Sequence, residues 1–172
     1  MGIDTFTIIS PGKTFNISGT RAASIIIKNK DMRDKFNTYM SGMKYPFSHD
    51  FVEAATVGAY MESEEWFEEV KEYIAENRRI FEKFINDRLT GLSVAKGDST
   101  YLMWVDCSGL NLSDEELESL WKEKCKLILS KGSEFGSRYS QFRRINIACQ
   151  REKLLLVLNR IETVLKNESY IK

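Results

Sequence analysis

The sequence Ser10-Pro11-Gly12-Lys13-Thr14-Phe15-Asn16-Ile17-Ser18-Gly19-Thr20-Arg21 follows directly after a short apolar run, Phe6 to Ile9, near the start of the chain. Pro11 and Gly12 interrupt that run and favour a turn. Lys13 is therefore expected at the C-terminal end of a strand, which is where open α/β sheets place the residues that bind ligands.

Lys13 has two neighbours that change what its amine can do. Most lysines are solvated surface residues, and Lys13 alone would be interpreted in that way. Ser10 lies three residues before it and Arg21 lies eight residues after it. A hydroxyl and a guanidinium beside one amine suit a phosphorylated ligand whose aldehyde condenses with the amine.

The run Ser-Pro-Gly-Lys-Thr-Phe-Asn-Ile-Ser-Gly, residues 10–19, resembles the cofactor-lysine segment of fold-type I pyridoxal-phosphate enzymes. It is most similar to the aminotransferase class I/II members that act as cystathionine β-lyase-like C–S lyases. The resemblance implies that Lys13 forms the Schiff base with pyridoxal 5'-phosphate and then acts as a general base. It also implies that Ser10 and Arg21 contact the phosphate of the cofactor.

The same resemblance continues in the run Phe142-Arg143-Arg144-Ile145-Asn146-Ile147-Ala148-Cys149-Gln150-Arg151. A period of two places the apolar residues on one face of a strand and Arg144 on the other. By this pattern alone, Arg144 is a surface arginine on a half-exposed strand. The resemblance implies instead that its guanidinium binds the α-carboxylate of an amino-acid substrate, which is a bidentate task. Arg151 also matches the motif, and we expect a structural role for it.

The pattern along the rest of the chain predicts an α+β fold with an antiparallel-rich sheet packed on helices. Strands are expected at residues 5–10, 22–28, 92–95, 101–106 and 142–149. Helices are expected at residues 32–40, 50–61, 63–90, 113–130 and 152–166. The run from Ser99 to Asp106 also resembles the small-domain strand of the same enzymes.

Residues that suit helix ends accompany several of these helices. Asp31 and Ser63 are expected as N-caps of the helices that follow them. Ser113 and Glu116 have the spacing of a capping box. Gly132 is expected to end the helix that this box begins.

The resemblance implies three regions. Residues 1–62 would be a remnant of the pyridoxal-phosphate-binding large domain, with two of its strands and the cofactor lysine. Residues 63–90 would be a long linking helix, and residues 91–172 would be the C-terminal small domain of an aminotransferase.

Composition excludes several classes of partner. Among 172 residues, 25 basic side chains balance 25 acidic ones, so nothing points to nucleic acid or an anionic membrane. There is no visible signal peptide and no run of about 18 apolar residues. The spacing of Cys107, Cys125, Cys149 and His49 fits no metal site, and we expect reduced thiols in a cytoplasmic protein.

The resemblance covers about the C-terminal half of such an enzyme. The preceding half would supply the rest of the phosphate site, the ring stacked on the cofactor and the aspartate paired with the pyridine nitrogen. We therefore expect part of an enzyme whose small-molecule substrate is an amino acid, acting either as a C–S β-lyase or as an aminotransferase. The chain alone should bind the cofactor weakly or not at all, and should be inactive or nearly so.

The alternative is an interaction module that pairs with a separate N-terminal half, or with itself, without catalysis. The continuous apolar run Ile25 to Ile27 suits a strand that is covered on both faces, and this chain offers few neighbours to cover it. Unpaired edges and apolar patches promote association, so a homo-oligomer such as a dimer is expected. A third interpretation, an unrelated α+β binding domain, is weakened by the order of the motifs.

Overall fold

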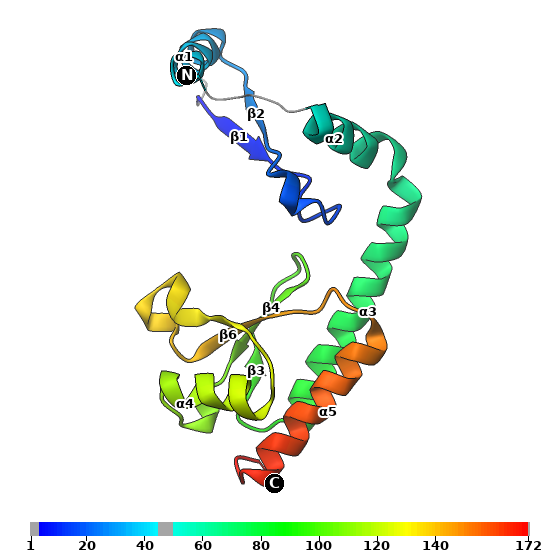
Figure 1. The fold of residues 1–172 in the computed structure, drawn as a ribbon, viewed down its shortest axis with the longest axis vertical. Helices are drawn as coiled ribbons and strands as arrows, with labels where there is room; N and C mark the ends of the chain where they lie inside the picture. The colour runs from blue at the N-terminus through cyan, green and yellow to red at the C-terminus, as the bar shows by residue number, and fades with distance from the viewer. Residues whose placement is uncertain (1–3, 45–49, 172) are drawn as a thin grey trace. The chain divides into compact units, whose positions relative to one another are not determined.

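The computed structural model describes residues 4–44 and 50–171 of the chain. The chain forms two compact units, Met1–Glu69 and Val70–Lys172, and the boundary between them falls within the long helix α3, Glu64–Arg88 (Figure 1). The elements are helices and short antiparallel strands, so the mixed α+β class predicted from the pattern is confirmed.

Most of the expected elements are found near their predicted positions. The strands are β1 (Phe6–Ile9), β2 (Ser24–Ile27), β3 (Ser93–Val94), β4 (Leu102–Asp106), β5 (Ser130–Lys131) and β6 (Phe142–Asn146). The helices are α1 (Lys30–Gly42), α2 (Asp50–Glu62), α3, α4 (Asp114–Ser119) and α5 (Arg151–Asn167). The pattern did not indicate β5, and it overestimated the length of α4.

The first unit contains a two-stranded antiparallel sheet of β1 and β2, in which Ile8 is the partner of Ile25. Ile27 is buried, but Ile25 and Ile26 are 41% and 48% exposed. The expectation of a strand covered on both faces is therefore not met within the described part of this chain. A two-stranded sheet has too few neighbours to bury both faces of a β-branched run.

Helix α1 begins two residues earlier than predicted, and its N-cap is Asn29, not Asp31. The Asn29 side chain accepts hydrogen bonds from the backbone N–H groups of Asp31 at 3.0 Å and Met32 at 3.2 Å. Asn is as good an N-cap as Asp, and the earlier position leaves the Asp31 carboxylate in the first turn, where the helix dipole favours it. At α3, the backbone carbonyl of Ser63 accepts the bond that starts the helix, while its hydroxyl donates to the carbonyl of Gly58 in α2.

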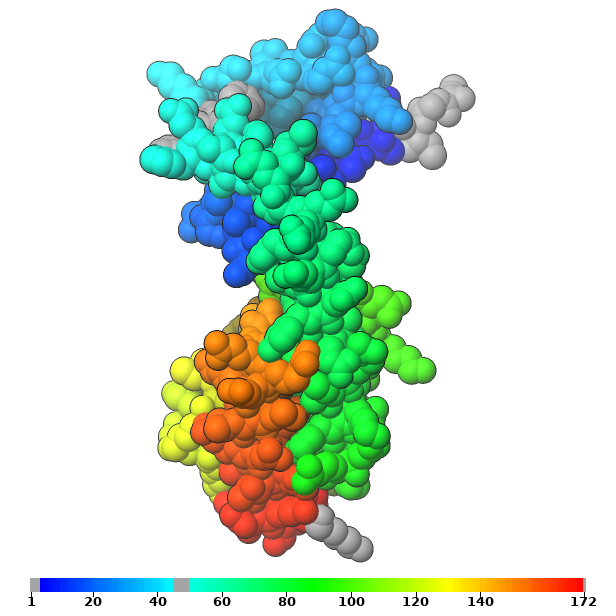
Figure 2. Space-filling model, turned by 90° about the vertical axis from the view of Figure 1, so that its right-hand side faces the viewer, coloured from blue at the N-terminus to red at the C-terminus, as the bar shows by residue number. Residues whose placement is uncertain are grey.

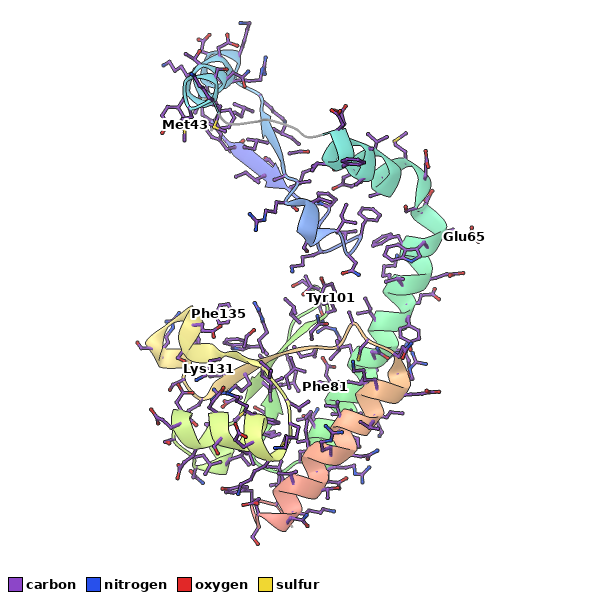
Figure 3. All side chains as sticks on the ribbon, in the orientation of Figure 1. Met43, Glu65, Phe81, Tyr101, Lys131 and Phe135 are labelled. Carbon is purple, nitrogen blue, oxygen red and sulfur yellow. The ribbon has the colours of Figure 1, made fainter. Side chains whose placement is uncertain are left out.

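The second unit is built on an antiparallel sheet with the strand order β3-β4-β6-β5. Along β4 and β6, buried and half-buried residues alternate, as a period of two requires. Met103 and Ile145, which are partners across the two strands, face the core. Helices α3, α4 and α5 supply the rest of this core, including Phe81, which points into the space between α3 and the sheet (Figure 3).

The capping box at the start of α4 is confirmed. The Ser113 hydroxyl accepts from the backbone N–H of Glu116 at 3.2 Å, and the Glu116 carboxylate accepts from the backbone N–H of Ser113 at 2.8 Å. These two bonds satisfy N–H groups that have no partner inside the helix, so the sequence motif alone locates this helix start.

The predicted end of this helix, near residue 130 with Gly132 as its stop, is wrong. The α-helix ends at Ser119 and continues as a single π turn, Leu120–Lys124, after which Lys126 adopts a left-handed backbone conformation with φ +56°. Residues 127 and 129 are leucines that pack on the core, and the chain then pairs with β6 as strand β5. Sheet pairing has overridden the helical preference of this stretch.

Helix α5 lies alongside the second half of α3 (Figure 2). Polar bonds link α3 to the residues just before α5 and to α5 itself. Asn77 on α3 is fully buried, and its side-chain amide donates to the carbonyls of Ile147 at 3.0 Å and Cys149 at 2.9 Å, just before α5 begins. Further along, Arg88 and Glu162 form an ion pair at 2.6 Å. No helix within residues 4–44 and 50–171 has the length and apolar character that a membrane span needs.

The three cysteines are free thiols. Burial raises the pKa of Cys107 to about 12, against an opposing effect of the nearby Arg143, and raises the pKa of Cys125 to about 11. Burial also raises the pKa of Cys149, which is only half-buried. No group of three metal-ligating side chains occurs in the described part of the chain, and His49 lies outside the described residues.

Alkaline pH should weaken the fold through Cys107. The thiol of the unfolded chain ionises near its ordinary pKa of 9.0, whereas the folded thiol stays protonated to about pH 12. The unfolded chain therefore releases this proton first, and the free energy of unfolding falls as the pH rises through this window, by up to about 1.4 kcal/mol per pH unit. Urea unfolding at a series of pH values should show a shallower fall in Cys107→Ala than in Cys149→Ala, and equal slopes would contradict the assignment.

Candidate functional site

The loop that carries Lys13 is closed on itself by side-chain hydrogen bonds. The Ser10 hydroxyl donates to the carbonyl of Ala22 at 2.7 Å, which joins the two ends of the loop between the last residue of β1 and the first residue of β2. The hydroxyl also accepts from the backbone N–H of Gly12 at 3.2 Å, and the Ser18 hydroxyl donates to the Gly12 carbonyl at 3.0 Å. Lys13 follows directly, on the exposed side of this closed loop.

Gly12 suits the close packing inside the loop. A Cβ at this position would lie 3.1 Å from the Cα of Ser18 and 3.3 Å from the Ser10 hydroxyl oxygen. The ring of Phe15 anchors the loop to the helices of the first unit, at 5.3 Å from the Tyr60 ring and 5.7 Å from the Phe67 ring. The loop is therefore fixed at two places. The Ser10 bond ties its ends together beside the sheet, and the Phe15 ring ties the turn after Lys13 to α2 and the first turn of α3.

The groups on this loop fit a phosphorylated aldehyde in kind. Lys13 and Arg21 are both exposed. The backbone N–H of Arg21 donates to the carbonyl of Ser18 at 3.1 Å, whereas its guanidinium forms no hydrogen bond or ion pair with the residues that the structure describes. The single proton of the Ser10 hydroxyl is donated to Ala22, so this hydroxyl would have to release that carbonyl before it could donate to a phosphate. The Arg21 guanidinium thus fits an anionic ligand directly, and Ser10 fits it after a change of partner.

Arg144 lies in the second unit, at the centre of a row of partners across three strands. It faces Trp104 on β4 and Ser130 on β5. Its guanidinium donates to the Ser130 hydroxyl at 3.0 Å and lies over the ring of Phe135, with the central carbon 4.8 Å from the ring centre. Figure 3 shows Phe135 on the turn that follows β5. The other N–H groups of the Arg144 guanidinium form no hydrogen bond within the described residues, so they remain available to bind a carboxylate.

Four aromatic rings gather on the Arg144 side of the sheet. The Trp104 ring stacks on Phe142 at 5.5 Å and meets the rings of Phe135 at 5.4 Å and Tyr139 at 5.9 Å. Among these rings, Phe135 covers one face of the Arg144 guanidinium.

Arg143, which sequence reasoning passed over, is fully buried on the core face of the same strand. It forms an ion pair with Asp114 at 2.7 Å and donates to the carbonyls of Ser140 and Phe142, both at 2.8 Å. The signal was present: the period of two that places Ile145 in the core places Arg143 there as well. A charge on an apolar face requires an acidic partner, and that requirement could have directed attention to this residue.

Arg151 has the contacts of a structural residue. Its side chain donates to the Asn77 side-chain carbonyl at 3.3 Å and lies over the Tyr73 ring at 4.6 Å. Its backbone N–H donates to the Tyr73 hydroxyl at 2.7 Å. Arg151 therefore fixes the start of α5 on α3.

The structure brings Ser10, Lys13 and Arg21 together on one loop of the first unit, and it places Arg144 in the second unit. No protein-family model matches the chain. Over 159 residues, or 92% of this chain, the sequence is 34% identical to cystathionine β-lyase PatB of Bacillus subtilis.

Two solved structures are similar over nearly the whole chain. One is a candidate aminotransferase from Clostridium difficile 630 with pyridoxal phosphate bound, with a TM-score of 0.87 and 36% identity over 93% of this chain. The other is cystalysin from Treponema denticola, which contains pyridoxal 5'-phosphate, with a TM-score of 0.84 and 28% identity over 95% of this chain. The chain spans about 41% of the length of each of these three relatives.

Proposed function

We propose that this chain is part of a pyridoxal-phosphate-dependent enzyme that acts on amino acids. The premise is its homology to fold-type I pyridoxal-phosphate enzymes of aminotransferase class I/II, including cystathionine β-lyase-like C–S lyases, over about 41% of their length. The chain would hold two strands of the large domain, a linking helix and the small domain. The observation that carries the proposal is the closed loop that presents Lys13 and Arg21 beside Ser10, in a chain 34% identical to a cystathionine β-lyase.

Each candidate residue would have a separate task in the intact enzyme. Arg21 and Ser10 would bind the phosphate of the cofactor by charge and hydrogen bonding. Lys13 would hold the cofactor through its amine and then move the proton from the substrate Cα. Arg144 would bind and orient the α-carboxylate with its N–H fork. Bound pyridoxal phosphate supplies an electron sink for the electron pair left at that carbon.

Either of two outcomes can follow from the loss of that proton. Departure of a thiolate from the β-carbon gives C–S lyase chemistry, and transfer of the amino group gives transamination. The isolated chain should carry out neither at an appreciable rate, and in the intact enzyme we propose a homo-oligomer or a pairing with the remaining half. The free thiols support a reducing compartment such as the cytoplasm.

Covalent trapping tests the role of Lys13. The purified chain is mixed with pyridoxal phosphate, reduced with borohydride and digested, and the modified lysines are located by mass spectrometry. We expect Lys13 to carry most of the label because the cationic loop concentrates the anionic aldehyde. Lys13→Ala should lose that label, whereas Lys28→Ala, which removes another exposed lysine of the same unit, should keep it. Label spread evenly over the lysines, with no change in Lys13→Ala, would contradict the proposal.

The exposed surface of β1 and β2 favours a second candidate function, an interaction module. Ile8 is 65% exposed beside its partner Ile25 at 41%. Light scattering should show a molar mass that rises with concentration, and Ile8→Lys with Ile25→Lys should abolish the rise. Ile128→Lys is the control, since Ile128 is 92% exposed in the other unit. A wild-type chain that stays monomeric at all concentrations would count against this function.

A further inference from the structure

The carboxylate of Asp114 joins both ends of the segment that precedes Arg144. One of its oxygens accepts from the guanidinium of Arg143 at 2.7 Å, and the other accepts from the Ser133 hydroxyl at 3.2 Å. The backbone carbonyl of Asp114 accepts a further bond from Arg143 at 3.1 Å. We call these three residues the Asp114 clasp.

The segment closed by the clasp carries the rings that surround Arg144. Phe135 lies two residues after Ser133, and Tyr139 and Phe142 precede Arg143. All three rings contact Trp104. The position of the Phe135 ring under the Arg144 guanidinium therefore depends on how the two ends of this segment are held.

Burial makes the clasp rigid. The Arg143 side chain is 0% exposed, and its bonds to Asp114, Ser140 and Phe142 use both ends of the guanidinium. A buried charge that turns away from its partners loses their compensation, so Arg143 has one favourable arrangement. Arg144 is the next residue, and this arrangement fixes the backbone from which its side chain starts.

We propose that Asp114 and Arg143 are positioning residues for the carboxylate site: the Asp114 clasp holds residues 133–143 so that Phe135 restrains the Arg144 guanidinium in one orientation. This inference rests on the proposed function, in which Arg144 binds the substrate carboxylate. Pre-orientation lowers the cost of ordering a long side chain when the carboxylate binds. The clasp residues themselves do not touch the substrate.

Nitrogen-15 NMR of the full chain tests the clasp, through the side-chain N–H signals of Arg144 and Trp104. In Asp114→Asn, which keeps the shape but removes the charge, these signals should shift and broaden. The control is Glu162→Gln, which removes the charge from the ion pair with Arg88 in the same unit. Glu162→Gln should lower the melting temperature and leave both signals in place, because a loss of stability alone does not reorient Arg144.

Two further variants keep the test decisive if Asp114→Asn does not fold. Ser133→Ala removes one bond of the clasp and should shift the Arg144 signal while Arg143 stays paired. Arg143→Lys can keep the ion pair but not the bonds to Ser140 and Phe142, because an ammonium lacks the fork. Arg144 and Trp104 signals that overlay on those of the wild type in whichever clasp variant folds would overturn the proposal.

A titration with sodium acetate, against sodium chloride at equal ionic strength, separates the clasp from the proposed function. Acetate should shift the Arg144 signals of the wild type, and its dissociation constant should rise about 3- to 10-fold in Asp114→Asn. A wild type that does not respond to acetate would count against the carboxylate role of Arg144, while the signals of the variants would still decide whether the clasp orients it. A response with equal affinity in wild type and Asp114→Asn would overturn the clasp and leave the proposed function standing.

Discussion

Asp114→Ala should lower the free energy of unfolding of this chain by about 3–5 kcal/mol, because it leaves the guanidinium of Arg143 buried without a counter-charge. Arg143 is fully buried, whereas the Asp114 side chain is 27% exposed. The remaining carbonyl partners of Arg143 compensate part of its charge but supply no opposite charge. Since a domain of this size has a total stability of roughly 5–15 kcal/mol, the variant should be close to unfolding. Urea denaturation followed by circular dichroism near pH ~7 measures the loss.

Two variants distinguish an uncompensated charge from other causes of this loss. Glu115→Ala removes the neighbouring exposed carboxylate on α4, and its effect should stay within about 0.5 kcal/mol. Asp114→Ala combined with Arg143→Met removes both charges, and should recover most of the stability because apolar side chains often replace a buried ion pair without cost. A double variant as unstable as Asp114→Ala alone would show that the charge of Arg143 is not the cause.

Gly132→Ala should be the most disruptive small substitution in the second unit. A Cβ at Gly132 would lie 1.9 Å from the carbonyl oxygen of Tyr139, 2.8 Å from the carbonyl oxygen of Phe142 and 2.9 Å from the Cβ of Phe142. The obstructing atoms belong mostly to the backbone, so no rotation of a side chain can relieve the overlap. Strand β6 or the turn before it must move, and we expect a loss of about 3 kcal/mol or more.

Gly97→Ala is the matched control, because a Cβ there would meet nothing within 4 Å. It should change the free energy of unfolding by less than about 1 kcal/mol. If alanine can adopt the backbone conformation of Gly97, the change should be an increase in stability. Urea denaturation of the two variants side by side makes the comparison. Equal stabilities would mean that the close approach at Gly132 can be relieved without cost.

The fold could be predicted where local chemistry decides it. The Ser113 capping box and the long helix expected at residues 63–90 depend on neighbours along the sequence, and both are found near their predicted positions. The end of α4 could not be predicted, because the stretch after it has no strong helix stop before Gly132. Strand β5 forms in this stretch because it pairs with the edge of β6, and the sequence of residues 120–131 alone does not indicate that pairing.

The candidate functional residues also include some that could be predicted from the sequence and contacts that could not. The loop around Lys13 is closed by Ser10 and Ser18 over short separations, so its residues could be recognised as a group from the sequence. The surroundings of Arg144 come from three strands and a turn. The alternation along β6 indicated its face, but it gave no information about Ser130 or Phe135.

The pairing of α3 with α5 has a consequence for synthesis on the ribosome. The bonds from Asn77 to the carbonyls of Ile147 and Cys149 join residues separated by 70 and 72 positions, and the bond between Arg88 and Glu162 spans 74. Because such distant partners meet only after long loops close, this core cannot assemble until α5 has left the exit tunnel. Until then the nascent α3 exposes Phe81 and its apolar neighbours to solvent, and these residues are natural binding sites for a chaperone.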